Sequence, residues 1–256
     1  MKPLTIDLFC GLGGWTDGLL AEGYNVVGFD IERHNYGTGG YPAQLILQDV
    51  LTLHGKQFRN AALIVASPPC QEFSYMAMPW SRAKAIAAEY RAGVRDVKQL
   101  TALFDVCFRI QREAIEAAGH FIPLVVENVR GACPWVGRSR WNYGSYHLWG
   151  DVPALMPMTK AIKNNGGSWF NIGSPGQKET NRNPVHEGQK LPGNNAPRMW
   201  QDRRVKRLAD AQRYDGDAFY IASSGSKARK AASAQIAKIP LPLARYIARS
   251  WWPKML

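Results

Sequence analysis

The stretch from Ala61 to Ser74 constrains the fold more than any other part of the chain. It begins with six apolar residues, Ala61–Ala66, and continues as Ser67-Pro-Pro-Cys-Gln-Glu-Phe-Ser74. A short apolar run bounded by turn residues is typical of an interior strand of a parallel sheet. Two prolines end that strand abruptly, so Cys70 is expected at the carboxyl edge, where open α/β folds bind ligands. The alternative is that Cys70 is one more small buried hydrophobic residue.

Length and composition favour a globular protein with a sizeable core. The chain has 256 residues, 46% of them hydrophobic, and no apolar run approaches the roughly 18 residues of a membrane span. Met1–Asp7 leads directly into a predicted strand without a signal-peptide pattern, so a cytoplasmic location is expected. The four cysteines show no CxxC pairing, which argues against a metal site and against a disulfide framework.

Basic residues are in large excess. The net charge is +12 at pH 7 and the isoelectric point is about 9.7. Such a surplus favours a polyanionic partner, most often nucleic acid. A generic basic surface without such a partner would give the same totals, so charge alone does not decide between the two.

The N-terminal segment has the order strand, glycine-rich turn, helix. Leu4–Phe9 has the pattern of a strand, Cys10–Gly14 is rich in glycine, and Trp15–Glu22 has the pattern of a helix. Glycine lets the backbone approach a ligand closely and adopt dihedral angles closed to other residues. By itself such a turn is a weak signal for a nucleotide-like cofactor.

Acidic residues follow the next two predicted strands. Asn25–Phe29 is followed by Asp30, about 20 residues after the glycines, where an acid can accept hydrogen bonds from ribose hydroxyls. Gln48-Asp49-Val50 ends a third short strand and brings Asp49 to the same edge, where it could accept a hydrogen bond from the adenine amine. A helix cap or a solvated loop acid is the alternative for Asp30.

These segments together resemble the DNA cytosine carbon-5 methyltransferase family, over about residues 4 to 130. Asp7–Gly14 resembles the family's first motif, Ser67–Gln71 its nucleophile motif, and Glu127-Asn-Val129 the motif that carries its catalytic glutamate. The order and spacing of the motifs are more specific than any one of them. The resemblance implies an α/β fold with the Rossmann-like sheet of methyltransferases that use S-adenosylmethionine.

The resemblance also implies which residues contact this cofactor. Asp30 corresponds to the acid that binds ribose, Ile31 to the side chain that packs on adenine, and Asp49 to the acid at the adenine amine. The implied cofactor-binding residues are Phe9, Gly11, Gly13, Asp30, Ile31, Asp49, Pro69 and Lys238.

The implied reaction is methyl transfer to carbon-5 of a cytosine flipped out of the DNA duplex. Cys70 would attack carbon-6 as a thiolate and so make carbon-5 nucleophilic. Phe121–Val126 is a predicted buried strand that delivers Glu127 to the same edge, where the carboxyl would bind the ring in the protonated form that burial favours. Arg138-Ser-Arg140 is the nearest match to the family's Arg-x-Arg pair, and Arg140 is the expected base contact. A phosphate contact or a solvated arginine is the alternative.

Two segments between these catalytic candidates have helical character. Tyr75–Val97 mixes aromatic, basic and small residues, and we interpret it as a catalytic loop that turns helical; an amphipathic surface helix is the alternative for its second part. Asp96–Ala118 has apolar residues at helical spacing, and Gly119 is its expected stop. Cys107 within it is expected to be structural.

The second half differs in composition. Residues 156–230 are rich in Gly, Asn, Pro and basic residues with little apolar periodicity. The resemblance implies that they form a small, loop-rich target-recognition region that reads DNA; an appendage without specificity is the alternative. Residues 1–155, completed by 231–256, are expected to form the catalytic domain that binds S-adenosylmethionine.

Ile236–Ala248 resembles the family's last motif, whose helix returns to the cofactor, but departs from it at one place. The family usually has Gly-Asn where this chain has Ile236-Ala237, and Lys238 follows. If Lys238 points inward, it could pair with the carboxylate of carboxy-S-adenosylmethionine, and the product would be 5-carboxymethylcytosine. Alternatively, Lys238 faces DNA phosphate or solvent.

The resulting hypothesis is a monomeric DNA (cytosine-5-)-methyltransferase that acts on double-stranded DNA. It would work in a bacterial cell or a phage-infected host, in restriction-modification or phage modification. RNA is an alternative substrate, because a related branch of the family acts on transfer RNA. A catalytically inactive DNA-binding regulator is another alternative, against which the intact Cys70 and Glu127 argue.

Overall fold

The chain divides into two units, Met1–Ala161 with Lys238–Leu256, and Ile162–Ala237. All elements described below belong to the first unit. The target-recognition region predicted for residues 156–230 lies almost entirely outside the described residues, so its role stays a prediction. The computed structural model describes residues 2–35, 40–71, 73, 80–156, 234 and 237–253.

A seven-stranded sheet forms the centre of the first unit, with the strand order β3-β2-β1-β4-β5-β7-β6. Strands β1 to β5 run parallel to one another, and β7 runs antiparallel to both β5 and β6. The predicted α/β fold with a Rossmann-like sheet is therefore confirmed. The strands are β1 (Leu4–Leu8), β2 (Asn25–Asp30), β3 (Gln44–Leu47), β4 (Ala61–Ala66), β5 (Leu124–Asn128), β6 (Trp141–Tyr143) and β7 (Tyr146–Gly150).

The order of the strands reverses at β1. From β1 the chain continues to β2 on one side, whereas β4 pairs with β1 on the other side. In open α/β sheets such a switch point opens a crevice at the carboxyl ends of the strands, and ligands bind there. Strands β1, β2 and β4 all end at this edge, and the segments that begin there contain predicted site residues.

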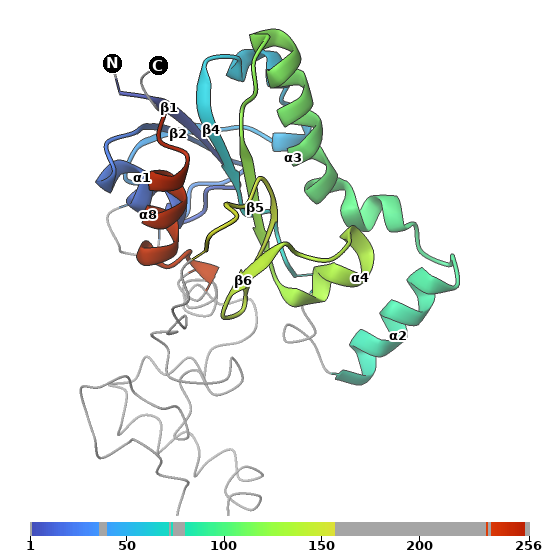
Figure 1. Cartoon of the computed structure of the whole chain (residues 1–256). Helices are drawn as coiled ribbons and strands as arrows, with labels where there is room; N and C mark the ends of the chain where they lie inside the picture. The colour runs from blue at the N-terminus through green and yellow to red at the C-terminus, as the bar shows by residue number, and fades with distance from the viewer. Residues whose placement is uncertain are drawn as a thin grey trace, which may run out of the picture. The chain divides into compact units, whose positions relative to one another are not determined.

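Helices cover both faces of the sheet (Figure 1). Helices α1 (Gly14–Ala21) and α8 (Leu241–Ser250) pack on one face, and α3 (Val97–Ala118) packs on the other. Side chains alternate along β4, so that Leu63 and Val65 belong to the core under α1 and α8, while Ile64 belongs to the core under α3. The remaining helices are α2 (Trp80–Arg91), α4 (Cys133–Val136) and the 3-10 helices η1 (Val50–Thr52), η2 (Gly55–Phe58) and η3 (Arg130–Ala132).

Helix α3 has the predicted bounds. Its N-cap is Asp96, whose carboxylate accepts a hydrogen bond from the Lys98 backbone N at 2.8 Å. It ends at Gly119, which has the left-handed φ of 70°. Cys107 is fully buried within it, as predicted for a structural cysteine. Helix α2 lies within the predicted segment Tyr75–Val97, but residues 74–79 lie outside the described residues.

Strand β5 begins later and ends later than the sequence pattern predicts. The predicted strand is Phe121–Val126, whereas the observed one is Leu124–Asn128. Phe121 is 57% exposed, and Pro123 has no N–H to donate to a neighbouring strand, so pairing begins after it. At the other end, β7 extends the pairing to Glu127 and Asn128. Glu127 is therefore part of the strand rather than the first residue beyond it.

The C-terminal helix α8 packs tightly on α1. A Cβ at Gly18 of α1 would collide with Ala244 of α8, so the absence of a side chain permits this close approach. Tyr24 Oη donates a hydrogen bond to the Ala248 carbonyl oxygen at 2.9 Å. Glu22 accepts from Arg245 at 2.5 Å and from Arg249 at 2.7 Å. These contacts join the last segment of the chain to the segment after the glycine turn.

Candidate active site

The nucleophile loop and the end of β5 are joined at the carboxyl edge of the sheet. Strands β4 and β5 are parallel neighbours, with Ala66 opposite Val126. The side-chain amide of Asn128 donates a buried hydrogen bond to the carbonyl oxygen of Pro68 at 2.9 Å. Cys70 follows Pro68 by two residues, and Glu127 directly precedes Asn128. The structure therefore brings the segments of the two predicted catalytic residues together at one edge.

The exposure of Cys70, Glu127 and the two prolines before Cys70 suits a site that admits a ligand. Glu127 is buried, with 8% of its surface exposed, and Cys70 is half-buried. Pro68 is buried and Pro69 is exposed, so the loop leaves the core between the two prolines. None of the four cysteines, all of which are described, forms a disulfide.

The glycine turn is joined to the nucleophile loop. Trp15, at the start of α1, donates from its indole nitrogen to the Ser67 hydroxyl at 3.0 Å. The Ser67 backbone N donates to the carbonyl oxygen of Leu8, the last residue of β1, at 3.1 Å. The ends of β1 and β4 and the start of α1 therefore form one hydrogen-bonded unit at the switch point.

The glycine turn itself has an unusual backbone. Phe9, Gly11 and Gly13 all have positive φ, at 56°, 49° and 72°. This left-handed region costs energy for Phe9 and is readily reached by glycine. A Cβ built at Gly11 would meet no heavy atom within 4 Å, so the turn borders open space there. This is the side from which a ligand can approach the backbone.

Asp30 closes the turn from the end of β2. One carboxylate oxygen accepts from the Gly11 backbone N at 2.9 Å, and the other lies 3.4 Å from His34 Nε2. Burial acts to raise the pKa of Asp30, but the hydrogen bonds from His34 and Gly11 outweigh it and lower the pKa. Asp30 is therefore ionised at neutral pH. The adjacent Ile31 is 69% exposed and offers an apolar surface beside this acceptor.

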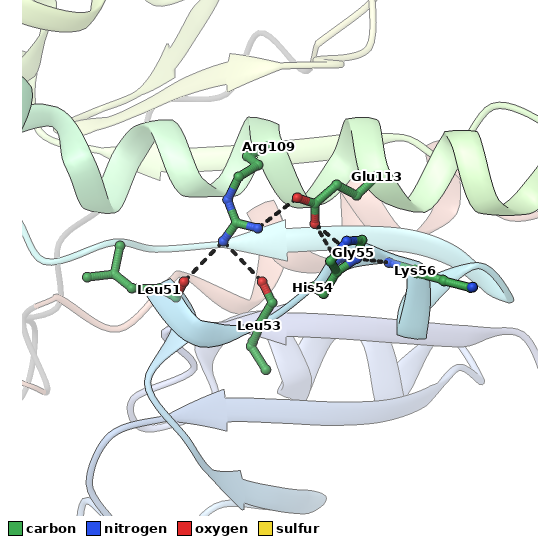
Figure 2. Close-up of polar contacts among 7 residues, drawn as sticks. All are labelled: Leu51, Leu53, His54, Gly55, Lys56, Arg109 and Glu113. Atoms are coloured by element: carbon green, nitrogen blue, oxygen red, sulfur yellow. Dashed lines mark hydrogen bonds and ion pairs between the residues drawn. The ribbon is translucent and has the colours of Figure 1, made fainter.

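Asp49 lies just after β3, at the N-cap of η1, where its carboxylate accepts from the Leu51 backbone N at 2.9 Å. The side chain of Arg109 on α3 holds this segment (Figure 2). Its Nη2 donates to the carbonyl oxygens of Leu51 at 3.1 Å and Leu53 at 3.0 Å. Glu113 accepts from Arg109 Nη1 at 2.8 Å. The sequence contains no motif that signals this contact between α3 and the Asp49 segment.

The sequence did not lead us to expect that Asp7 is a buried acid. It is fully buried in β1, and its Oδ2 accepts a hydrogen bond from Thr16 Oγ1 at 2.6 Å. Its Oδ1 has no hydrogen-bond partner among the described residues. Burial raises the pKa of Asp7 to about 8, although the hydrogen bonds with Thr16 and Tyr41 act to lower it. The available signal was a carboxylate in a short strand whose other side chains are Leu, Thr and Ile.

Lys238 lies just before α8 and has a carboxylate partner. Its Nζ is 2.7 Å from Asp17 Oδ2 on α1, and both side chains are about one third exposed. Its carbonyl oxygen accepts from Tyr146 Oη at 3.2 Å. The ammonium group is therefore already paired with an acid of the protein.

Arg140 lies on the other face of the sheet from Glu127. Glu127 is paired with Leu148, which belongs to the core under α1 and α8, and paired residues of neighbouring strands point to the same face. Arg140 and Arg138 instead line a hollow with Phe104 of α3. The structure does not bring Arg140 together with Glu127, and the expected base contact has no geometric support.

Two further properties of the described residues bear on the chemistry. No helix among them is long and apolar enough to cross a membrane. Across the same residues, no group of three or more His, Cys, Asp or Glu side chains gathers in a way that could hold a metal ion.

The chain is similar to known methyltransferases in sequence and in structure. No curated protein matches it. A solved structure of a candidate DNA modification methyltransferase from an E. coli prophage is 20% identical over 51% of this chain and 33% of that chain, with a TM-score of 0.33. This chain thus spans about a third of that enzyme. The Entamoeba histolytica methyltransferase EhMeth is 12% identical over 98% of both chains, with a TM-score of 0.48. Dnmt2 of S. pombe is also 12% identical over 98% of both chains, with a TM-score of 0.44.

The family comparison concerns the part of the chain from β1 to the start of α3. Residues 4–97 match the model of the family described as C-5 cytosine-specific DNA methylase. This range contains the glycine turn, Asp30, Asp49 and Cys70, so the predicted resemblance to this family is confirmed for this part of the chain. Over residues 4–97, the chain is therefore similar to the C-5 cytosine-specific DNA methylase family.

Proposed function

We propose that this chain transfers a methyl group from S-adenosylmethionine to carbon-5 of a cytosine in double-stranded DNA, with Cys70 as the nucleophile and Glu127 as the group that binds the base. The observation that carries the proposal is the hydrogen bond from Asn128 Nδ2 to the Pro68 carbonyl oxygen, at 2.9 Å. It joins the nucleophile loop, which lies within the family match, to the strand end that bears Glu127.

The residues at the switch point fit S-adenosylmethionine. Gly11 borders open space, Asp30 is an ionised acceptor suited to ribose hydroxyls, and Ile31 exposes an apolar side chain suited to adenine. Asp49 is exposed on the neighbouring strand end and keeps lone pairs for an amine. When bound, the cofactor supplies a methyl group that is electrophilic because it is attached to a sulfonium.

The reaction at the cytosine has two stages. The thiolate of Cys70 forms a bond to carbon-6, and the electron pair of the 5,6 double bond moves to carbon-5, which takes the methyl group. A base then removes the proton of carbon-5, the double bond re-forms and the thiolate leaves. One methyl group thus replaces one proton. Because carbon-6 is stacked within a duplex, the cytosine must first be flipped out.

Glu127 would hold the N3 and amino edge of the cytosine. Tyr146 of β7 is a polar neighbour of Glu127, and it lies close enough for the charge of Glu127 to affect the pKa of Tyr146. Burial raises the pKa of Tyr146, and the negative charge of Glu127 raises it further. Tyr146 is therefore a neutral hydroxyl, and it donates to the Lys238 carbonyl oxygen. This bond connects the strand beside Glu127 to the segment before α8.

Double-stranded DNA as substrate is supported by the family match and by the net charge of +12. Lys and Arg side chains neutralise backbone phosphates, and an excess of them favours a polyanion. RNA as substrate has the same electrostatic support, so the two are separated by experiment.

The test of the proposal is covalent trapping. DNA of mixed sequence containing 5-fluorocytosine is incubated with the protein and S-adenosylmethionine; fluorine cannot leave as a proton, so the adduct persists. We expect a denaturation-resistant complex whose linkage maps to Cys70 by mass spectrometry. Cys70→Ser should abolish it, whereas Cys133→Ser should not, because Cys133 is also a half-buried thiol but lies in α4, outside the nucleophile motif. Trapping only on fluorinated RNA would move the activity to RNA, and no adduct with either would favour the regulator.

The alternative donor, carboxy-S-adenosylmethionine, requires the charge of Lys238 to be available to it. The ion pair with Asp17 at 2.7 Å compensates that charge, so the geometry favours the methyl donor. Mass spectrometry of nucleosides from DNA treated with each donor decides the matter. Formation of 5-carboxymethylcytosine would overturn this choice.

A further inference from the structure

We propose that the hollow between α3 and the segment Val136–Arg140 is a second binding site, for a nucleotide. Its volume is about 600 Å³, which is within the range of small-molecule sites. It lies on the α3 face of the sheet and reaches Asp151, which is bonded to Leu124 at the amino end of β5. The carboxyl edge with the candidate active site is at the opposite end of that strand. The inference does not depend on the proposed methyl transfer.

Three arginines line this hollow. Arg112 comes from α3, and Arg138 and Arg140 come from the segment before β6. All three residues are exposed, and among the described residues their guanidinium groups have neither a hydrogen-bond partner nor an ion pair. By contrast, Arg109, on the same helix, pairs with Glu113. A planar guanidinium matches the oxygens of a phosphate in bidentate geometry.

Three aromatic side chains form part of the remaining lining of the hollow. Trp149 and Phe104 are buried and stand edge to face, with ring centroids 5.3 Å apart, and Phe108 lies 5.5 Å from Phe104 and is partly exposed. Trp149 is held by a hydrogen bond from its indole nitrogen to the Gly137 carbonyl oxygen at 2.9 Å. The aromatic wall is therefore rigid, and a flat ring can pack against its exposed part at Phe108.

Two carboxylates at the hollow argue for a nucleotide rather than a bare anion. Asp151 Oδ2 already accepts from the Leu124 backbone N and from Gln111, and Asp105 Oδ2 accepts from Thr101. Each has a second oxygen with lone pairs to offer. Inorganic phosphate would be repelled by these charges, whereas a nucleotide presents its sugar hydroxyls or ring N–H groups to them and its phosphate to the arginines.

Calorimetry tests whether the hollow binds a nucleotide, and a second titration then distinguishes a free nucleotide from one within a strand. The intact chain is titrated with dTMP, thymidine and inorganic phosphate, with S-adenosylhomocysteine in excess to occupy the donor site. We expect dTMP to bind, with thymidine and phosphate each about tenfold weaker or more, because each lacks one set of contacts. The double variant R112Q/R138Q should bind dTMP about tenfold more weakly or worse. K56Q/R59Q, which removes two exposed charges outside the hollow, should bind it like the parent chain.

A thymidine octamer identifies the source. If the octamer displaces dTMP and binds with higher affinity than dTMP, and if this binding is lost in R112Q/R138Q, the site is assigned to a nucleotide within a strand. If the octamer does not displace dTMP, the site is assigned to a free nucleotide. Both outcomes support a nucleotide site. Absence of dTMP binding, equal binding by R112Q/R138Q, or equal binding of inorganic phosphate would overturn the inference. Circular dichroism melting of the variants verifies that each is folded.

Discussion

Arg109 and Glu113 lie one turn apart on α3 and form an ion pair at 2.8 Å that holds the segment after Asp49. The same guanidinium donates to the carbonyl oxygens of Leu51 and Leu53, and Glu113 also accepts from the Gly55 backbone N at 2.6 Å. The segment of Asp49, at the carboxyl edge, is thereby tied to a helix whose apolar face packs in the core. We therefore predict that Arg109 is a positioning residue for the proposed cofactor site.

Replacing Arg109 by Gln should weaken cofactor binding more than turnover. The carbonyl oxygens of Leu51 and Leu53 lose a charged donor, so the Asp49 segment gains freedom, and we expect S-adenosylmethionine affinity to fall about 3- to 10-fold. Equilibrium binding and a comparison of KM for the cofactor with kcat check this. Arg59→Gln is the control, because Arg59 is exposed after η2. A fall in kcat with unchanged cofactor affinity would contradict the positioning role.

Replacing Asn128 by Ala should lower turnover more than cofactor binding, the reverse of the effect expected for Arg109→Gln. The buried Pro68 carbonyl oxygen loses its donor, which costs about 1–3 kcal/mol of stability, and the nucleophile loop loses its connection to β5. We expect kcat to fall about tenfold or more with little change in cofactor affinity. Urea unfolding and steady-state kinetics measure the two effects. Asn142→Ala removes an exposed amide that donates to the Gly144 carbonyl oxygen, and it should leave both nearly unchanged.

The contribution of His34 to stability should depend on pH. The hydrogen bond with Asp30 raises the pKa of His34 above its unfolded value, so the stabilisation is complete below the unfolded pKa and is lost as pH rises through the folded pKa. The lowered pKa of Asp30 means that the contribution of this carboxylate is lost as pH falls through its folded pKa. The pair is therefore most stabilising in the mildly acidic range between the two.

His34→Gln should accordingly reduce the free energy of unfolding more at about pH 5.5 than at about pH 9. Denaturant titrations at both pH values measure the difference. His120→Gln is the control, because His120 is exposed and its ring nitrogen contacts only the Ala118 carbonyl oxygen among the described residues. An equal loss at both pH values would show that the ion pair with Asp30 does not contribute.

Asp7 should make the protein less stable as pH rises. Its pKa is raised from 3.8 to about 8, so the folded state binds a proton that the unfolded state releases, and stability falls between these two values. Asp7→Asn cannot ionise, and its free energy of unfolding should fall less between pH 4 and pH 8 than that of the parent chain. Asp105→Asn, a change at an exposed acid, serves as the control. Parallel pH profiles for D7N and the parent chain would refute the buried, protonated acid.

The local sequence was sufficient for several strands and helices of the first half and for the edge at which the candidate site lies, but not for the bounds of β5 or for β6 and β7. A short apolar run bounded by turn residues, such as Ala61–Ala66, favours an interior strand, and the prolines after that run end it before Cys70. The period of α3 and its ends at Asp96 and Gly119 follow from side-chain spacing, capping and the left-handed conformation that glycine accepts. These are short-range properties, and each depends on residues within one turn or one strand.

Contacts between distant segments were decided by the tertiary structure alone. The hydrogen bond from Asn128 to Pro68, the ion pair of Lys238 with Asp17, and the clamp of Arg109 each join residues far apart in the chain. The face on which Arg140 lies depends on the pairing register of β6 and β7, because a shift of one residue moves a side chain to the other face. Periodicity specifies which residues face a core. Which groups then meet across it is set by packing and strand register.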